Sequence, residues 1–222
     1  MITSDGARDS SRHDALSIIH AEHRSLSAVL WSLNYLVRET RIAPDFELLS
    51  LMIDYIEMFP ERLHHPKEDQ HLFAALRRRT PDAETVLQPL AAEHARGAHM
   101  IDDLRFALTR YRVAGEAGRA EFATAVHAYV QFHWEHMRKE EEVVLPLAAR
   151  VLTQDDWQAI AAAFSESGDP LLGPAAQTAL RALFQTILTL APPPVGLGSA
   201  RDVSKPTARS GGCAPESSEA QV

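Results

Sequence analysis

Residues 87–108, which read LQPLAAEHARGAHMIDDLRFAL, contain the pattern that decides the fold. Leu87, His94, Ile101 and Leu108 recur every seven residues. Residues at this spacing share one face of an α-helix, because a helix turns by about 100° per residue. The stretch therefore predicts a helix with one buried face, and His94 lies in the middle of that face.

The rest of the chain has the same helical spacing of apolar residues and no convincing alternating strand. Pro44 suits the first turn of a helix, and Thr80-Pro81-Asp82 is a strong start signal for another. We expect an all-α fold, an up-down antiparallel four-helix bundle with one or two extra C-terminal helices. The expected helices cover residues 14–38, 44 to beyond 59, 80–113 and 119–150, followed by 153–164 and 175–190.

The composition predicts one soluble, cytoplasmic domain. The net charge of -8 argues against partners such as nucleic acid or an anionic membrane surface. Residues 1–13 lack the apolar stretch of a secretory signal, and we expect them to be flexible. Cys213 is the only cysteine, so no disulfide framework is expected. Residues 14–190 should form the bundle with its extension, and residues 191–222, rich in proline and glycine, a disordered tail.

Histidines lie on the predicted inner faces of all four long helices. His23 stands midway between Leu16 and Leu30 in the first helix, and His136 follows Tyr129 by seven residues in the fourth. The second helix carries His64 and, four residues later, Glu68. His99 and His127 fall well away from their apolar faces, so we expect them at the surface.

Two glutamates after His136 compete for the inner face. Glu140 follows by four residues and lies about 40° round the helix, whereas Glu141 lies about 140° away. The regular helix therefore favours Glu140, although a local bulge could reverse the order.

The set of inward residues points to a metal. One histidine on an apolar face is more often a hydrogen-bonded core residue than a ligand. Four imidazoles and two carboxylates in one core would be costly to bury unless a cation compensated them. Mixed nitrogen and oxygen ligands on bundle helices are the donors of di-iron sites.

Four motifs in this order resemble a known family. They read AEHR at 21–24, LHHPKED at 63–69, AEH at 92–94 and HMRKEEE at 136–142, the last running on to LPLA at 145–148. The sequence resembles the bacterial hemerythrin-like, or HHE cation-binding, domain proteins. Further similarity at Asp155-Asp156-Trp157 and Gly168-Asp169-Pro170-Leu171 extends the resemblance over residues 14–190.

The resemblance implies two iron ions held by His23, His64, Glu68, His94 and His136. The last carboxylate is Glu141 by the spacing of the oxygen carriers of the family and Glu140 by that of other relatives. The carriers also have a histidine four residues after the third-helix ligand, where this chain has Ala98. Water, or a neighbour such as His20, His65 or His133, would have to fill that position. His20 and His133 are otherwise expected to support the ligands from outside.

The missing ligand argues against reversible oxygen carriage and leaves three functions open. The family resemblance favours a protein that senses or handles oxygen, nitric oxide or peroxide and has no catalytic residues of its own. The alternatives are a di-iron oxidase or peroxidase, and a structural or regulatory module that binds zinc or another divalent metal. A homodimer through the C-terminal helices is a further expectation.

Overall fold

The computed structural model describes residues 4–40, 43–165 and 173–198, and this part is almost entirely helical, without strands. The α-helices are α1 (Ser4–Arg38), α2 (Phe46–Ile56), α3 (His65–Lys67), α4 (Ala74–Arg79), α5 (Glu84–Ala114), α6 (Glu116–Lys139), α7 (Leu145–Val151), α8 (Gln154–Ser165) and α9 (Gly173–Leu190). Wider π-helical turns form η1 (Glu57–His64), η2 (Glu68–Phe73) and η4 (Glu140–Val144), and η3 (Pro81–Ala83) is a 3₁₀ turn.

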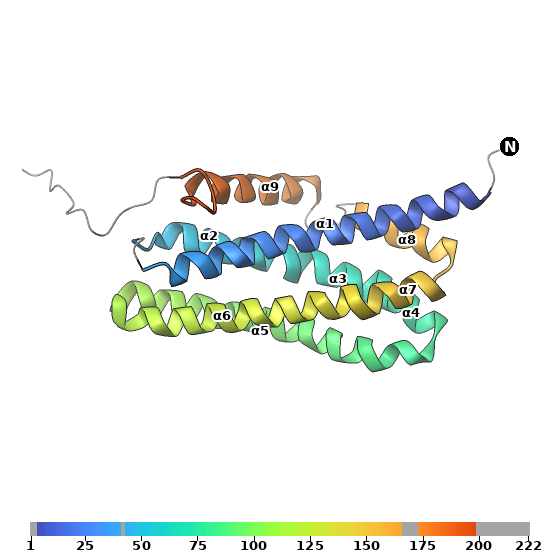
Figure 1. Cartoon of the computed structure of the whole chain (residues 1–222), viewed down its shortest axis with the longest axis horizontal. Coiled ribbons are helices and arrows are strands. Elements are labelled where there is room, and N and C mark those ends of the chain that lie inside the picture. Colours follow the sequence, from blue (N-terminus) through green and yellow to red (C-terminus); the bar gives the residue numbers. More distant parts are fainter. Residues whose placement is uncertain (1–3, 41–42, 166–172, 199–222) are drawn as a thin grey trace, which may run out of the picture.

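Four long helical rods form the expected antiparallel bundle (Figure 1). They are α1, the run from α2 to α4, α5, and the run from α6 to α7. Each rod packs against the next along the chain, and α6 also packs against α1, which closes the bundle. Between α5 and α6 the chain turns at Gly115, whose φ of 59° is one that glycine adopts readily. The predicted all-α bundle is confirmed.

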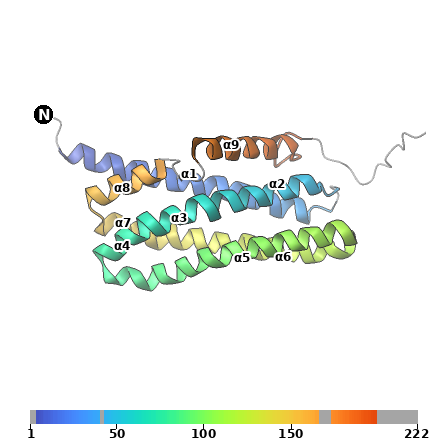
Figure 2. The same ribbon diagram turned by 180° about the vertical axis from the view of Figure 1, so that it is seen from behind.

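The two extra helices cover one side of the bundle, as Figure 2 shows from behind. Helix α8 packs on α1, and Thr153 and Asp156 cap its start by reciprocal bonds: Asp156 accepts from the Thr153 amide at 2.9 Å. Helix α9 lies along α2, where the Phe184 and Tyr55 rings are 5.6 Å apart. Each of these two helices therefore packs one of its faces against the bundle. A dimer through these helices stays a prediction.

Some boundaries differ from those expected. Helix α1 begins at Ser4, before the expected Asp14. The tail begins in an ordered turn, because Ala191 is fully buried and the amide of Leu197 donates to the carbonyl of Leu188 at 2.9 Å. This hydrogen bond satisfies a carbonyl at the end of α9 that the helix itself cannot satisfy. Residues 199–222 and the 168–171 motif lie outside the described residues.

Pro66 does not end the second rod, because the turns on either side of it are widened. The chain stays helical from α2 through α4, with η1 before Pro66 and η2 after it. The amide of His65 donates to the carbonyl of Pro60, five residues earlier, which is the π-helical pattern. The prolines are thus accommodated without ending the rod.

The apolar core is divided into two clusters along the bundle. One includes Leu33, Met52, Leu104 and Phe122, and the other includes Ile19, Leu72, Leu87 and Val144. Most of the buried polar side chains among the described residues are histidines and glutamates. None of the described helices is both long enough and apolar enough to cross a membrane.

Candidate metal centre

The structure brings together all six residues expected to bind metal. Each rod contributes at least one of them, and all six side chains are buried: His23 on α1, His64 on η1, Glu68 on η2, His94 on α5, His136 on α6 and Glu140 on η4. Their positions agree with the expected site, and metal binding by these residues stays a prediction.

The four histidines form two pairs. The Nε2 atoms of His23 and His64 are 3.1 Å apart, and those of His94 and His136 are also 3.1 Å apart. In each pair the imidazoles come from neighbouring antiparallel rods and direct the same ring nitrogen to a common point. This is the arrangement in which two neutral imidazoles can share one cation.

Each carboxylate extends from one histidine pair to the other. Glu68 places Oε1 3.2 Å from Nε2 of His64, and Oε2 3.6 Å from Nε2 of His94. Glu140 places Oε1 3.1 Å from Nε2 of His136, and Oε2 3.4 Å from Nε2 of His23. The two carboxylates are therefore placed to bridge two metal positions.

The charges and hydrogen bonds of these carboxylates fit a cation. None of the four oxygens of Glu68 and Glu140 accepts a hydrogen bond. Burial and the Glu68 charge raise the pKa of Glu140, but the nearby His136 and His94 outweigh them and lower it to about 2. Two buried anions without hydrogen-bond donors are costly, and a bound cation removes that cost.

Outer carboxylates lie against the Nδ1 atoms of the four histidines. An Nδ1–H that donates to a carboxylate fixes the tautomer with its Nε2 lone pair free for a metal. Three of these contacts are hydrogen bonds, with Nδ1-to-oxygen distances of 2.8 Å for His23 and Glu141, 2.7 Å for His64 and Glu22, and 3.0 Å for His136 and Glu93. The fourth, between His94 and Asp69, is a 3.1 Å contact without hydrogen-bond geometry.

These outer carboxylates follow an internal repeat. Residues 22–69 and 93–141 each begin with Glu-His and end with His-x-x-x-Glu followed by an acidic residue. Within each half, the first glutamate supports the second histidine: Glu22 supports His64, and Glu93 supports His136. The last acid supports the first histidine of the other half. Sequence reasoning missed these supports, although the available signal was an acid directly before His23 and His94 and directly after Glu68 and Glu140.

Of the three histidines that could replace the ligand missing at Ala98, His65 is the one that lies against His94 and His136. Its buried ring stacks on His94 with ring centroids 4.2 Å apart, and it forms one candidate metal group with Glu68, His94 and His136. Burial lowers the pKa of His65 to about 4, despite a hydrogen bond to Glu61, so the ring is neutral and can coordinate. Ala98 is exposed, and a ligand at that position would point away.

The π-helical turns explain which neighbours face inward. A π turn advances the chain by a smaller angle per residue than an α turn, so the consecutive His64 and His65 can both be buried. In the fourth rod the π turn begins only at Glu140, so the four-residue spacing from His136 is that of a regular helix. Glu140 is 1% exposed and Glu141 is 41% exposed, in agreement with the helical-face argument.

The remaining histidines lie outside the centre. His20 is 41% exposed and 3.5 Å from Glu141. His133 is fully buried, with Nε2 3.3 Å from Oε1 of Glu61. His99 and His127 are exposed, as their positions on the helices predicted.

The comparison with protein families agrees with this geometry. The model of the hemerythrin HHE cation-binding domain matches residues 14–148. The chain belongs to this family. Its HHE domain binds metal cations, and the buried histidine and glutamate groups are suited to such a site. No curated protein matches the chain. The family match ends within α7, so the similarity expected as far as residue 190 stays a prediction.

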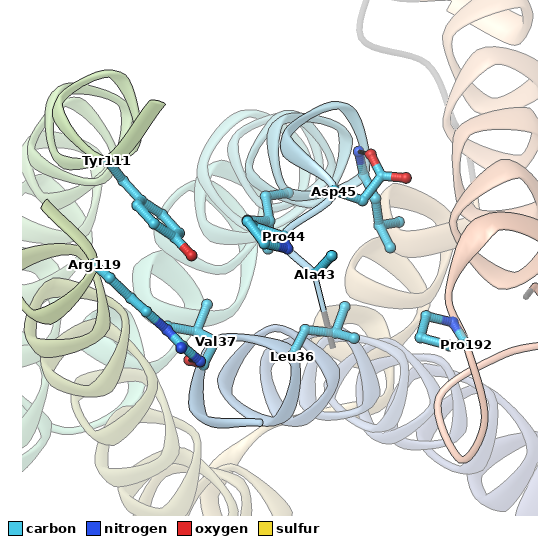
Figure 3. Close-up of a pocket in the computed structure, with 10 residues that line it drawn as sticks. Leu36, Val37, Ala43, Pro44, Asp45, Tyr111, Arg119 and Pro192 are labelled. Carbon is cyan, nitrogen blue, oxygen red and sulfur yellow. Dashed lines mark hydrogen bonds between the residues drawn. The ribbon is translucent and has the colours of Figure 1, made fainter. Parts of the chain in front are cut away.

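Two of the hollows on the described part of the HHE bundle and its extension are relevant to ligand binding. The apolar one in Figure 3, between Val37, Pro44, Tyr111 and Pro192, has a volume of about 30 Å³. That is room for about one water molecule and no organic substrate. The other is a surface recess between α1 and α6, which includes Met137 and extends to His23.

Proposed function

We propose that the HHE domain binds two iron ions and uses them to sense or handle oxygen, nitric oxide or peroxide. One ion would lie between His23 and His64, and the other among His65, His94 and His136. Glu68 and Glu140 would bridge them. The observation that carries the proposal is the span of these two carboxylates across both histidine pairs, with no other hydrogen-bond partner for their oxygens.

The donor set favours iron over zinc. Imidazole and carboxylate ligands suit both metals, but structural zinc takes four ligands in a closed tetrahedron. The position at His94 and His136 has five donors available, counting His65 and one oxygen from each bridging carboxylate. A pair of metals bridged by two carboxylates is characteristic of di-iron proteins on bundle helices.

The two positions differ in a way that favours one for the small ligand. The His23 and His64 position has four donors, one fewer than its neighbour. It also lies beside the surface recess that extends to His23. We therefore assign binding of the diatomic molecule or peroxide to this position.

The surrounding side chains hold the site and keep it dry. Phe73 stacks on His94 with centroids 5.5 Å apart, and Phe164 meets the edge of His64 at 6.1 Å. When bound, iron supplies the change of oxidation state and an open coordination position. The chain supplies oriented imidazoles, the negative charge of the bridging pair and an apolar wall that limits water.

Anaerobic loading with ferrous iron tests the proposal. We expect the loaded protein to change its absorption spectrum on addition of oxygen, nitric oxide or hydrogen peroxide, each offered separately. Repeated consumption of peroxide would assign an enzyme, whereas one response per centre would assign a sensor. His99→Ala, which alters an exposed histidine on α5, is the matched control and should respond as the unaltered chain does. A protein that takes up no iron would refute the proposal.

A further inference from the structure

A buried tyrosine is linked to the candidate metal centre through one carboxylate. Tyr129 is fully buried, and its hydroxyl donates to Oε1 of Glu61 at 3.1 Å. The other oxygen of Glu61 lies 3.3 Å from Nδ1 of His65, whose ring stacks on His94. Phenol, carboxylate and imidazole thus form one continuous chain that ends at the metal position.

The chain from tyrosine through glutamate to histidine has no counterpart in the second half of the internal repeat. Glu61 precedes His64 by three residues, and the equivalent residue before His136 is His133. These two are in contact, since Nε2 of His133 is 3.3 Å from Oε1 of Glu61. Likewise, the residue that follows His64 is His65, whereas Met137 follows His136. The departure from the repeat concentrates Glu61, His65 and His133 beside a single metal position.

Packing alone does not account for Glu61. Its side chain is only 5% exposed, and its carboxylate lies 3.1 Å from the Tyr129 hydroxyl and 3.3 Å from ring nitrogens of His65 and His133. The space for it depends on Gly97, where a Cβ atom would lie 2.8 Å from Oε1 of Glu61. Apolar residues at positions 61 and 129 would fill the same core at lower electrostatic cost.

We propose that Tyr129 donates one electron to the metal centre while its phenolic proton passes to Glu61. The proposal rests on the proposed iron function, with hydrogen peroxide as the oxidant. Reduction of one peroxide to two waters breaks the O–O bond and consumes two electrons and two protons. In a centre that holds one ferrous and one ferric ion, one electron would come from the ferrous ion and one proton from solvent. Tyr129 supplies the second electron as a neutral tyrosyl radical forms. Its O–H bond breaks, an O–H bond forms on Glu61, and the Glu61 proton leaves to complete the second water.

The geometry suits this step. An oxidised phenol is a strong acid, so a carboxylate already within hydrogen-bond distance can take its proton without rearrangement. Burial raises the pKa of Tyr129 well above its ordinary value, which keeps the phenol protonated until the electron leaves. The stacked rings of His65 and His94 place the electron acceptor close to Glu61.

Electron paramagnetic resonance tests the proposal on the full chain. Protein loaded anaerobically with ferrous iron is oxidised by one electron per centre, mixed with one equivalent of hydrogen peroxide and frozen at once. We expect a tyrosyl-radical signal that changes shape when the tyrosine rings are deuterated. Tyr129→Phe should lose the signal and keep the iron content of the unaltered chain. Tyr111→Phe, which alters a buried tyrosine beside the Figure 3 cavity, should keep both.

A second variant separates proton transfer from packing. Glu61→Gln keeps a hydrogen-bond acceptor for the phenol but takes no proton, so radical formation should slow by about a hundredfold or more. An unchanged radical in Tyr129→Phe would overturn the proposal. Absence of any radical in iron-loaded protein that consumes peroxide would overturn it and leave the iron function intact. Failure to bind iron would refute both.

Discussion

The consecutive residues Glu140, Glu141 and Glu142 have three different environments, so their alanine variants form a matched series. Their side chains are 1%, 41% and 63% exposed. Glu140 faces both metal positions, Glu141 supports His23 from outside, and Glu142 lies near Arg138 at the surface. The loss of iron affinity should therefore be largest for Glu140→Ala, smaller for Glu141→Ala and smallest for Glu142→Ala.

The magnitudes follow from the contacts. Glu140→Ala removes one oxygen from each metal position, and each charged contact is worth about 1.5–3 kcal/mol. The sum of about 3–6 kcal/mol corresponds to a loss of about 10²–10⁴ in affinity. Glu141→Ala removes only an outer support, which costs about 10–100-fold. Glu142→Ala should change the free energy of iron binding by no more than about 0.5 kcal/mol.

Competition with a chromophoric chelator under anaerobic conditions measures the three affinities, and circular dichroism shows that each variant is folded. Glu142→Ala is the control for changes of net charge. If Glu141→Ala loses more iron affinity than Glu140→Ala, the five-residue spacing of the oxygen carriers holds here and our assignment of Glu140 is wrong.

Three further predictions concern the metal content and stability. His65→Ala should hold one iron in place of two, because it removes a donor from one position only; full occupancy by elemental analysis would argue against coordination by His65. Removal of iron should cost about 2.7 kcal/mol relative to protein with free metal at a hundredfold over Kd, which lowers Tm by about 5–11 °C; equal melting curves would contradict this. Burial raises the pKa of Asp156, but hydrogen bonds from Arg79 and Thr153 outweigh it and hold that pKa well below its ordinary value. The Asp156 carboxylate therefore stabilises the fold above its unfolded pKa of about 3.9, and this contribution is lost as the pH falls below that value. The Tm of Asp156→Asn should thus be below that of the unaltered protein at pH 7, and the two Tm values should converge in acid. A difference in Tm that does not change with pH would contradict this prediction.

Much of the fold and the inner residues could be predicted because they depend on local periodicity. The seven-residue spacing around His94 determines which face of α5 is buried, whatever the helix packs against. The four-residue spacing of His136 and Glu140 predicts the burial of Glu140 for the same reason, since the π turn begins only at Glu140.

The rest depends on contacts that sequence spacing does not contain. His65 faces inward because of a π turn that begins upstream at Glu57, and regular helical spacing does not predict that turn. The hydrogen bond between Glu22 and His64 joins two different rods. Predicting it would require the positions of these rods relative to each other along the bundle axis. Ala191 is buried because the chain folds back on α9, whereas composition alone predicted a solvated tail.

Metal content per chain, measured on freshly purified protein together with its absorption spectrum, tests the central claim most directly. We expect two irons per chain and a charge-transfer band in the near ultraviolet and visible range. One zinc or no metal, persisting after ferrous iron is offered without oxygen, would contradict the di-iron assignment and favour a structural or regulatory bundle.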